Sequence, residues 1–381
     1  MIKNLTIENF KGFKKLELPI LKQITLLAGK NHIGKSTVLE AIMLLNNPSL
    51  SPQILPNIVN RENIMAMVPK FDIAIHGLFY NFDTSKSVGI ISDSLFMNVE
   101  YNDNCKYEVS GVGGQPDIKT EMVSSGIEFT YKDAVKEVIF TAKSIRHTII
   151  NDMYLGNVEQ KIYKTLADVV TNTILIDEFG SIYRNNNYYN AAPPAMQNIP
   201  LNMQRLDASV IEFENIRNDQ IKKDALIKAL NIIDADIIDV EYGNKTSVNQ
   251  FNKMTIEVRK KNLSKTLALS VLGQGIKKIF NIVCGIVSNQ DGILLIDELE
   301  NGLHFSIMPH VWEIIYELSK KYNCQLIITT HSLELVKYAV LIEKFSEHDF
   351  TFIKLFDNAG TISAYSYSQL QDSAESELDV R

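Results

Sequence analysis

The sequence predicts an α/β fold, and three stretches of the chain carry that prediction. Residues 24–28 form a short apolar run, typical of a buried strand, that stops at a glycine. From residue 35 onward, apolar side chains recur at helical spacing until an Asn-Asn-Pro sequence at residues 46–48 ends the pattern. From about residue 254 to residue 355, strand-like and helix-like segments alternate. Together these patterns indicate an α/β domain with a mixed central sheet.

Two further regions are expected to be β-structure. Residues 2–18 alternate apolar and polar side chains around Lys11 and Gly12, which predicts a hairpin-like pair of strands. Residues from about 71 to 140 contain several strand-like segments separated by turn residues and predict an antiparallel β subdomain. Its expected strands are residues 72–82, 97–101 and 127–131.

The middle of the chain differs in composition from both ends. Residues 181–200 are rich in asparagine and proline and predict an exposed loop, and residues 201–233 predict a long helical tract. We therefore expect an N-terminal lobe at residues 1–150, a loop and helical insertion at residues 151–250 and a C-terminal lobe at residues 251–381.

Composition places the chain among soluble globular proteins. It has 381 residues, enough for two domains or for one large α/β domain with an insertion. Hydrophobic residues make up 45% and charged residues 22%, and the mean hydropathy is −0.03, which excludes disordered and fibrous classes. No apolar run approaches the roughly 20 residues that span a bilayer, and residues 1–12 do not resemble a signal peptide. We expect a cytoplasmic protein with no membrane partner.

Charge and cysteine content narrow the function further. The 38 basic and 45 acidic residues give a net charge of −7, so nucleic-acid binding would need a local basic surface. The three cysteines, Cys105, Cys284 and Cys324, are far apart and show no CxxC spacing. That spacing argues against a structural zinc site and a disulfide framework.

Residues 29–36, GKNHIGKS, match the phosphate-binding pattern GxxxxGK[ST]. The match lies between a predicted strand and a predicted helix, as its mechanism requires. The glycines allow backbone N–H groups to surround the β-phosphate, and Lys35 places a cation on the β and γ oxygens. The hydroxyl of Ser36 is the expected ligand of Mg²⁺. A glycine turn before an amphipathic helix is the alternative interpretation.

Residues 293–298, ILLIDE, form an apolar strand that ends in two carboxylates. From such a strand Asp297 can reach Mg²⁺ through water, and Glu298 can polarise the water that attacks the γ-phosphate. Residues 174–178, ILIDE, have the same shape and compete for this role. We take Asp177 and Glu178 as surface carboxylates, because the later strand is followed by a second strand that ends in a histidine, His331.

Residues 270–275, SVLGQG, precede a strongly amphipathic helical pattern. Glycines and a small polar residue just before a helix predict a second anion-binding terminus. An ordinary capped helix start is the alternative.

These motifs, in this order, carry a resemblance to a known group of proteins. Residues 5–13 (LTIENFKGF), the phosphate loop, the glycine signature, the carboxylate pair and the strand ending at His331 resemble the ABC-type ATPase heads of the RecF, Rad50 and SMC group. Residues 296–304 (IDELENGLH) look most like the OLD-family branch, the ATPases of overcoming-lysogenization-defect nucleases and their antiphage relatives. The specific motifs cover about residues 1–50 and 260–340. The resemblance implies an ABC-type P-loop ATPase head with ATP and Mg²⁺ as cofactors.

The resemblance also implies roles for individual residues. Glu298 would be the catalytic base, His331 the switch histidine near the γ-phosphate, and Asp297 with Ser36 the Mg²⁺ ligands. The nucleotide-binding residues expected in the phosphate loop are Gly29, Asn31, Gly34, Lys35, Ser36 and Thr37. Those expected in the signature, facing a partner's nucleotide, are Ser270, Gly273, Gln274 and Gly275.

The chain departs from the group in three respects. Its signature reads SVLGQG where transporters carry LSGGQ, so either Ser270 or the backbone of residues 273–275 would meet the partner's γ-phosphate. The helical tract is too short for a Rad50 or SMC coiled-coil arm, and no glutamine is assigned to the γ-phosphate. Only about forty residues follow the His331 region. We therefore expect the ATPase without the Toprim nuclease module of full OLD proteins.

Three functions remain open at this point. The first is an ATPase subunit that dimerises, or assembles further, through its ATP sites and regulates a separately encoded effector, a Toprim-type nuclease or a toxin, in antiphage defence. The second is a RecF-like clamp that binds DNA when ATP is bound, and the third is a nucleotide-binding scaffold with little turnover. The altered signature and the N-terminal strands disfavour a transporter subunit.

Four minor features have both functional and structural interpretations. Asp234 and Asp236 are either metal ligands or solvated carboxylates at a helix end. The basic residues are either a nucleic-acid contact or a solvated face: Arg259, Lys260, Lys261, Lys265, Lys277 and Lys278. His32 is expected at a variable loop position, and His304 acts either across a dimer interface or in packing.

Overall fold

The protein is described here from a computed structural model. It describes residues 1–46, 76–93, 95–110, 119–133, 140–149, 152–155, 160–162, 173–176, 182–184, 213–214, 216–243, 255–342 and 345–374.

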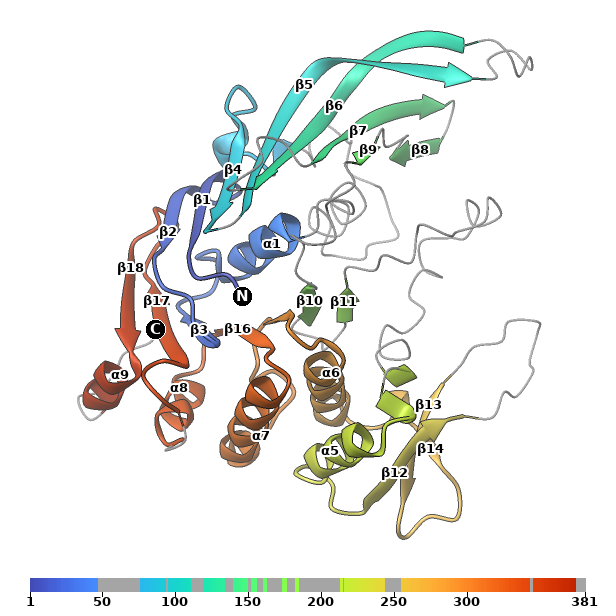
Figure 1. The fold of residues 1–381 in the computed structure, drawn as a ribbon, viewed down its shortest axis with the longest axis vertical. Coiled ribbons are helices and arrows are strands. Elements are labelled where there is room, and N and C mark those ends of the chain that lie inside the picture. Colours follow the sequence, from blue (N-terminus) through green and yellow to red (C-terminus); the bar gives the residue numbers. More distant parts are fainter. Residues whose placement is uncertain are drawn as a thin grey trace.

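A mixed seven-stranded sheet forms the centre of the molecule, in the order β11-β10-β15-β16-β3-β17-β18 (Figure 1). Its strands are β3 (Ile24–Ala28), β10 (Thr173–Ile176), β11 (Ile182–Arg184), β15 (Ile293–Ile296), β16 (Gln325–Thr330), β17 (Phe350–Leu355) and β18 (Ile362–Ser366). The five inner strands of this order, β10, β15, β16, β3 and β17, run parallel to one another. The edge strands β11 and β18 pair antiparallel with their neighbours. The predicted α/β class with a mixed central sheet is confirmed.

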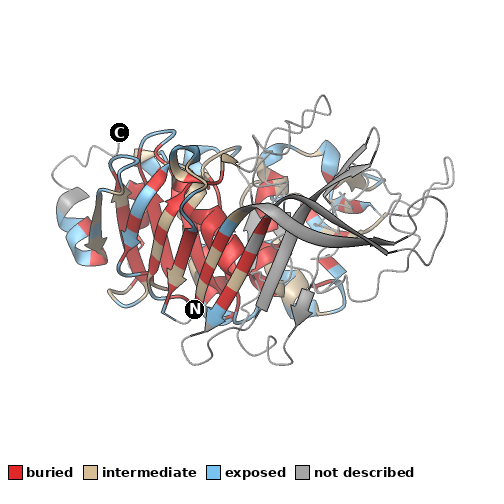
Figure 2. Ribbon diagram, turned by 90° about the horizontal axis from the view of Figure 1, so that it is seen from above, coloured by how far each residue is buried: buried red, intermediate tan, exposed pale blue. Residues whose placement is uncertain are grey.

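The apolar runs of the sequence arise because both faces of this sheet are covered. Successive side chains of a strand point to opposite faces, so each strand contributes to two cores. Leu26 and Ile296 belong to one core cluster, whereas Leu27 and Leu295 belong to the other. Figure 2 shows the buried positions running through the central strands.

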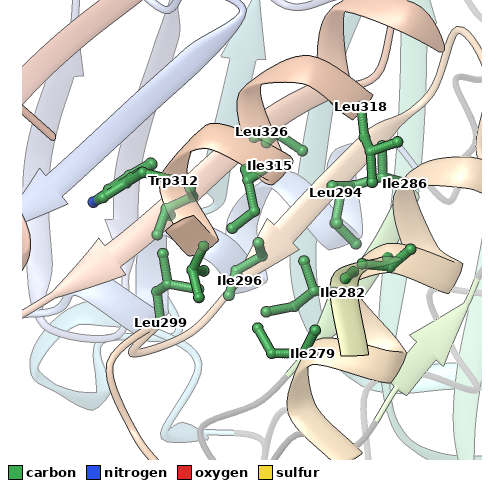
Figure 3. Close-up of a cluster of buried hydrophobic side chains, with 14 of the residues drawn as sticks. Ile279, Ile282, Ile286, Leu294, Ile296, Leu299, Trp312, Ile315, Leu318 and Leu326 are labelled. Carbon is green, nitrogen blue, oxygen red and sulfur yellow. The ribbon is translucent and has the colours of Figure 1, made fainter. Parts of the chain in front are cut away.

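Helices cover one face of the sheet. These are α6 (Gln274–Ser288), α7 (Met308–Lys321), α8 (Leu333–Val340) and α9 (Tyr367–Ala374). In Figure 3 the apolar side chains of α6 and α7, such as Ile282 and Ile315, meet Leu294 and Ile296 of β15. The indole Nε1 of Trp312 donates a 3.1 Å hydrogen bond to the carbonyl of Leu335, which ties α7 to α8.

The other face carries α1 (Lys35–Leu45) and a second, antiparallel sheet in the order β2-β1-β4-β5-β6-β7-β8, with β9 paired to β7. Its strands are β1 (Leu5–Phe10), β2 (Phe13–Leu18), β4 (Val88–Ser92), β5 (Leu95–Ser110), β6 (Lys119–Asp133), β7 (Phe140–Ile149), β8 (Asp152–Leu155) and β9 (Gln160–Ile162). The N-terminal pair is antiparallel, with Phe10 opposite Phe13. The predicted hairpin and antiparallel β subdomain are therefore present.

The strand predicted at residues 72–82 is wrong in its described part. Residues Tyr80–Phe82 form a 3₁₀ turn, η1, in which Asn81 and Phe82 have φ angles of 52° and 60°. A side chain in the left-handed region interrupts an extended strand, and the alternation of the sequence does not reveal it. Residues 72–75 lie outside the described part of the chain.

A small third sheet and one helix lie beside α6. The sheet has the order β12-β13-β14, formed by β12 (Ile237–Tyr242), β13 (Ile256–Lys260) and β14 (Leu267–Ala268). Helix α5 (Gln220–Leu230) packs on α6, and Asp219 caps its N-terminus by accepting from two backbone N–H groups. The helix predicted at residues 201–233 is thus confirmed only for its last part, and residues 201–212 lie outside the description. No described helix has the length and apolarity needed to cross a membrane.

Candidate active site

Three neighbouring parallel strands bring the predicted motifs to one edge of the central sheet. The phosphate loop follows β3, the carboxylate pair follows β15, and His331 follows β16, which lies between them. The C-terminal ends of parallel strands meet at the same edge, and ligands of open α/β sheets bind there. Motifs almost 300 residues apart in the sequence are therefore adjacent in space.

The loop at residues 29–36 holds Lys35 at the start of α1. Gly34 precedes the helix with a φ of 94°, and a Cβ there would lie 2.4 Å from the Phe13 ring of the N-terminal hairpin, so the position requires glycine. The Lys35 ammonium is buried and donates to the carbonyls of Gly29 at 2.7 Å and Lys30 at 2.8 Å. Desolvation lowers the pKa of Lys35 below its usual value, although three neighbouring carboxylates counteract part of that shift.

Asp297 is 5% exposed, and two hydroxyl groups contact the same oxygen of its carboxylate. Ser36 donates to Oδ1 at 3.1 Å, and Thr329 donates to Oδ1 at 2.5 Å. Hard oxygen donors from the phosphate loop and from β15 thus converge at one point, and such donors suit Mg²⁺. The residues predicted to hold Mg²⁺ fit that ion.

The carboxylate of Glu298 is half-buried beside three polar residues. Asn301 donates to its Oε2 at 2.5 Å, and the Nδ1 atom of His331 lies 3.6 Å from its Oε1. The backbone N–H of Glu298 donates to the hydroxyl of Thr329 at 2.8 Å. Glu298 has a φ of 46°, an uncommon value for a residue with a side chain, and such conformations persist only where surrounding contacts hold them.

Glu300 connects the turn after β15 to the segment after β16. Its Oε1 accepts from the hydroxyl of Thr330 at 2.9 Å and from the backbone N–H groups of His331 and Ser332 at 2.8 and 3.1 Å. The same oxygen lies 3.2 Å from Nδ1 of His331. The backbone and ring of His331 are therefore both held against this carboxylate.

Sequence reasoning missed Thr329, Glu300 and Asn301 as parts of the site. Asn301 and Glu300 lie within the segment that carried the OLD-like resemblance, so the motif itself was the available signal. For Thr329 the sequence offered no signal of a role in the site, because threonine also occurs in apolar strands where only packing is required.

Ser270 lies in the 3₁₀ turn at residues 269–271, and Gly273, Gln274 and Gly275 lie at the start of α6. Ser270, Gly273 and Gln274 are exposed, and Val271 is 73% exposed. Gly275 packs closely on the turn after β15, since a Cβ there would lie 2.6 Å from the carbonyl oxygen of Gly302. In the part of the chain that the structure describes, no hydrogen bond or ion pair connects residues 270–275 with residues 29–37.

The remaining predicted loop residues are at the surface or in the first turn of α1. Asn31 and His32 are exposed, and His32 has a φ of 66°. Thr37 is half-buried next to Ser36. His304 caps the short turn η7 (Phe305–Ile307) through its Nδ1, which accepts from the Ser306 N–H at 3.3 Å. His304 is exposed, so the structure shows a turn cap and not a half-buried packing position, and a role across a dimer interface stays a prediction.

Two residues of the basic run are paired with acidic residues. Lys260 contacts Asp234 at 2.6 Å and Arg259 contacts Glu241 at 2.8 Å. Lys278 is buried, so the idea that it contributes to a nucleic-acid surface is wrong. Asp234 is paired, and Asp236 accepts from the Asn262 amide at 3.2 Å, as expected for carboxylates beyond a helix end.

Asp177 and Glu178 lie outside the described residues. The strand before them, β10, pairs in parallel with β15, and Ile176 is opposite Ile296. The competing carboxylate pair therefore follows a strand that ends in register with the one before Asp297.

Comparison with known proteins identifies related sequences over most of the chain. The family model described as an AAA ATPase domain, AAA_15, matches residues 1–336. An ATP/GTP phosphatase of Helicobacter pylori is 25% identical over 366 residues, which cover 92% of this chain and 90% of that protein. An OLD nuclease of Thermus scotoductus is 23% identical over 356 residues, covering 87% of this chain and 59% of that protein. The match thus spans about three fifths of the nuclease's length.

Solved structures of SMC heads are also similar to the chain. An SMC head bound to the C-terminal winged-helix domain of ScpA has a TM-score of 0.47 at 15% identity, covering 96% of this chain and 97% of that one. An SMC head of Pyrococcus furiosus with an extended coiled coil, bound to the C-terminal domain of ScpA, has a TM-score of 0.46 at 11% identity and covers 98% of each chain.

Proposed function

The chain belongs to the AAA_15 family of ATPase domains and hydrolyses ATP, and from this premise we propose that two copies close around ATP and thereby control an effector protein. The observation that carries the proposal is the position of the signature. Ser270, Gly273 and Gln274 are exposed, and among the described residues no hydrogen bond or ion pair joins the signature to the phosphate loop of its own protomer. A second copy would supply the missing half of each nucleotide site, and a symmetric pair would bury two nucleotides at one interface.

The residues at the sheet edge divide the chemistry among them. Lys35 meets the β- and γ-phosphate oxygens, and the backbone N–H groups of the loop at residues 29–36 surround the β-phosphate. Ser36 and Asp297 would hold Mg²⁺, which would supply positive charge beside the phosphates.

Glu298 acts as the general base that orients the attacking water. Its carboxylate is held by Asn301 and lies within 3.6 Å of His331, so its lone pairs have a fixed direction before the substrate arrives. His331 lies at the end of β16 beside the phosphate loop strand, a position from which its imidazole can contact the γ-phosphate. When the γ-phosphate leaves, this contact and the one to the signature of the other copy are lost together, and the pair opens.

The proposal also specifies what kind of protein the effector is. One relative is named as a nuclease, and it extends well beyond the part that matches this chain. We propose that the nucleotide-driven change in this chain regulates a nuclease or toxin encoded separately, in antiphage defence. ATP-dependent closure would change the surface presented to that effector, and hydrolysis would reset it.

Light-scattering mass measurement tests the nucleotide-driven association. Wild-type protein and Glu298→Gln are measured with and without Mg·ATP at two protein concentrations. Glu298→Gln retains ATP binding but lacks the base, so ATP should shift it to a dimer or a multiple of one. If the mass is the same with and without Mg·ATP although ATP still binds, the result would favour the scaffold with little turnover. ATP-dependent DNA retention that falls steeply with salt would instead favour the clamp.

A mixing experiment tests whether the two halves of a site come from different copies. Lys35→Ala removes the cation of the loop, and Gly273→Asp places a carboxylate where the signature would meet a γ-phosphate. Each variant alone should remain monomeric with Mg·ATP, because neither can complete a site with a second copy of itself. In an equal mixture, the intact loop of the Gly273→Asp copy and the intact signature of the Lys35→Ala copy complete one site, so ATP should drive the formation of mixed dimers. No association in the mixture, with ATP binding by Gly273→Asp demonstrated, would contradict the shared site.

A further inference from the structure

Lys278 is a buried charged residue. It lies in α6, one turn after the signature, and is 2% exposed. Burying an ammonium group is costly unless it is hydrogen-bonded. A leucine or methionine would fill the same space without that cost, so the amine itself needs an explanation.

The Lys278 amine contacts the backbone of Glu298, the proposed general base. Nζ of Lys278 donates a short hydrogen bond to the carbonyl oxygen of Glu298 and lies 3.5 Å from the carbonyl oxygen of Asp297. These two carbonyls belong to the residues that follow β15. Lys278 therefore holds the chain at the point where the sheet ends and the catalytic segment begins.

This contact matters because the backbone of Glu298 is in an unfavourable conformation. Its φ of 46° sets the direction of the carboxylate, and the residue needs partners on both sides of the peptide to stay there. Thr329 accepts from its N–H at 2.8 Å, and Lys278 donates to its carbonyl. Without the amine, the contact to the carbonyl of Glu298 is missing, and the contacts from Thr329 and Asn301 remain as its hydrogen bonds to the rest of the site.

Helix α6 also begins with the signature residues that would contact the partner's nucleotide. Gly273 and Gln274 form the exposed start of α6, and Gly275 packs on the Gly302 carbonyl of the turn after Glu298. A shift of the helix on contact with a second nucleotide would reach Glu298 through Lys278. Between these points lies only one turn of a regular helix, which is stiff enough to transmit a small displacement.

We propose that Lys278 is a positioning residue that couples the signature helix to the general base, so that engagement of the signature is transmitted to the backbone of Glu298. This inference rests on the proposed function, because it requires a partner nucleotide at the signature. It gives a route by which contact of the signature with the partner's nucleotide reaches the base of the same copy. Nothing in the coupling requires Lys278 to touch ATP itself.

The test compares Lys278→Met, which keeps the length of the side chain but has no donor, with Lys278→Arg, which keeps a cationic donor. Lys277→Met is the matched control, since Lys277 is the neighbouring lysine on the same helix and is only half-buried. For each protein, ATP affinity, nucleotide-driven mass, kcat, KM and the dependence of specific activity on protein concentration are measured.

Loss of the donor should affect turnover and leave binding intact. For Lys278→Met we expect kcat to fall by about tenfold or more, as when a partner that orients a site residue is removed, with KM and ATP affinity within about twofold of wild type. The variant should still dimerise, and its remaining specific activity should still rise with protein concentration, because each site needs both copies. Lys278→Arg should recover part of kcat, and Lys277→Met should match wild type.

The outcomes separate this inference from the function on which it rests. If the wild-type protein does not associate with ATP, the proposed function fails whatever Lys278 does. If it associates and Lys278→Met turns over at the wild-type rate, the coupling is overturned and the proposed function stands. A parallel loss of ATP affinity and dimerisation would assign Lys278 a merely structural role. Should Lys278→Met fail to fold, Lys278→Gln is measured in its place, with the same fall in kcat expected.

Discussion

The hydroxyl of Thr329 donates a 2.5 Å hydrogen bond to Oδ1 of Asp297. The same hydroxyl accepts from the backbone N–H of Glu298 at 2.8 Å, so one side chain of β16 orients both carboxylate-bearing residues that follow β15. A shared contact of this kind fixes the distance between the metal-binding carboxylate and the proposed base.

Replacing Thr329 by valine should therefore reduce turnover without removing any residue that touches ATP. Valine has the same shape but can neither donate to Asp297 nor accept from Glu298. We expect kcat to fall about 10- to 100-fold, as for other partners that orient metal ligands. Thr351→Val, a buried threonine of β17 in the same sheet, is the control and should retain wild-type kcat. Equal rates for Thr329→Val and wild type would show that the shared contact is dispensable.

A second prediction concerns the two similar carboxylate pairs. Asp297→Ala should abolish ATP hydrolysis, because it removes the oxygen that lies with Ser36 at the proposed metal site. The double variant Asp177→Ala with Glu178→Ala should retain wild-type turnover. Steady-state phosphate release at saturating Mg·ATP shows which of the two carboxylate pairs is required for hydrolysis. The opposite pattern would mean that β10, which is in register with β15, carries the essential carboxylates.

The two glycines at the start of α6 should respond differently to alanine. A Cβ on Gly273 would meet no atom of its own protomer within 4 Å, whereas one on Gly275 would lie 2.6 Å from the Gly302 carbonyl oxygen. Gly275→Ala should lower the melting temperature because a backbone atom must move. Gly273→Ala should melt like wild type yet hydrolyse ATP more slowly, since the added methyl would intrude only on a partner's nucleotide. Thermal denaturation and ATPase rates, measured together, separate the two effects. Unchanged turnover in a stable Gly273→Ala would argue against the shared site.

The buried thiol of Cys324 gives a prediction about pH. Burial raises the pKa of Cys324 from its usual 9.0 to about 12, so the folded protein keeps this proton where the unfolded chain loses it. The resulting contribution to stability is complete below pH 9.0 and is lost as the pH rises through about 12. The stability advantage of wild type over Cys324→Ala should therefore shrink above pH 9.0.

Thiol labelling checks the same assignment at a single pH. In a Cys105→Ser background, Cys284 and Cys324 remain, and both are buried. Neither should react with a disulfide reagent at pH 8.5 until denaturant is added, after which both should react. Rapid labelling of Cys324 in the native protein would contradict its burial.

The sequence predicted the local parts of the site because each depends on neighbours in the chain. The strand before Gly29 and the helix after Gly34 follow from apolar spacing and from a turn that only glycine permits. That the loop, Asp297 and His331 would meet was implied by the family resemblance, and the structure shows why: their strands are parallel neighbours whose ends share one edge of the sheet. The prediction failed at residues 80–82, where two side chains in the left-handed region replace an extended strand.

By itself, the sequence determined which elements form and which residue types stand at their ends, because hydrophobic periodicity and turn chemistry act over a few residues. Only the tertiary structure decided which side chains hold the proposed base. Thr329, Glu300 and Lys278 reach the Glu298 and His331 segments across separations of 20 to 32 residues. The order of strands in the sheet and the packing of α6 set those contacts. Lys278, one of several lysines in a basic run, became a buried partner of the catalytic backbone because the apolar face of α6 turns it toward the end of β15.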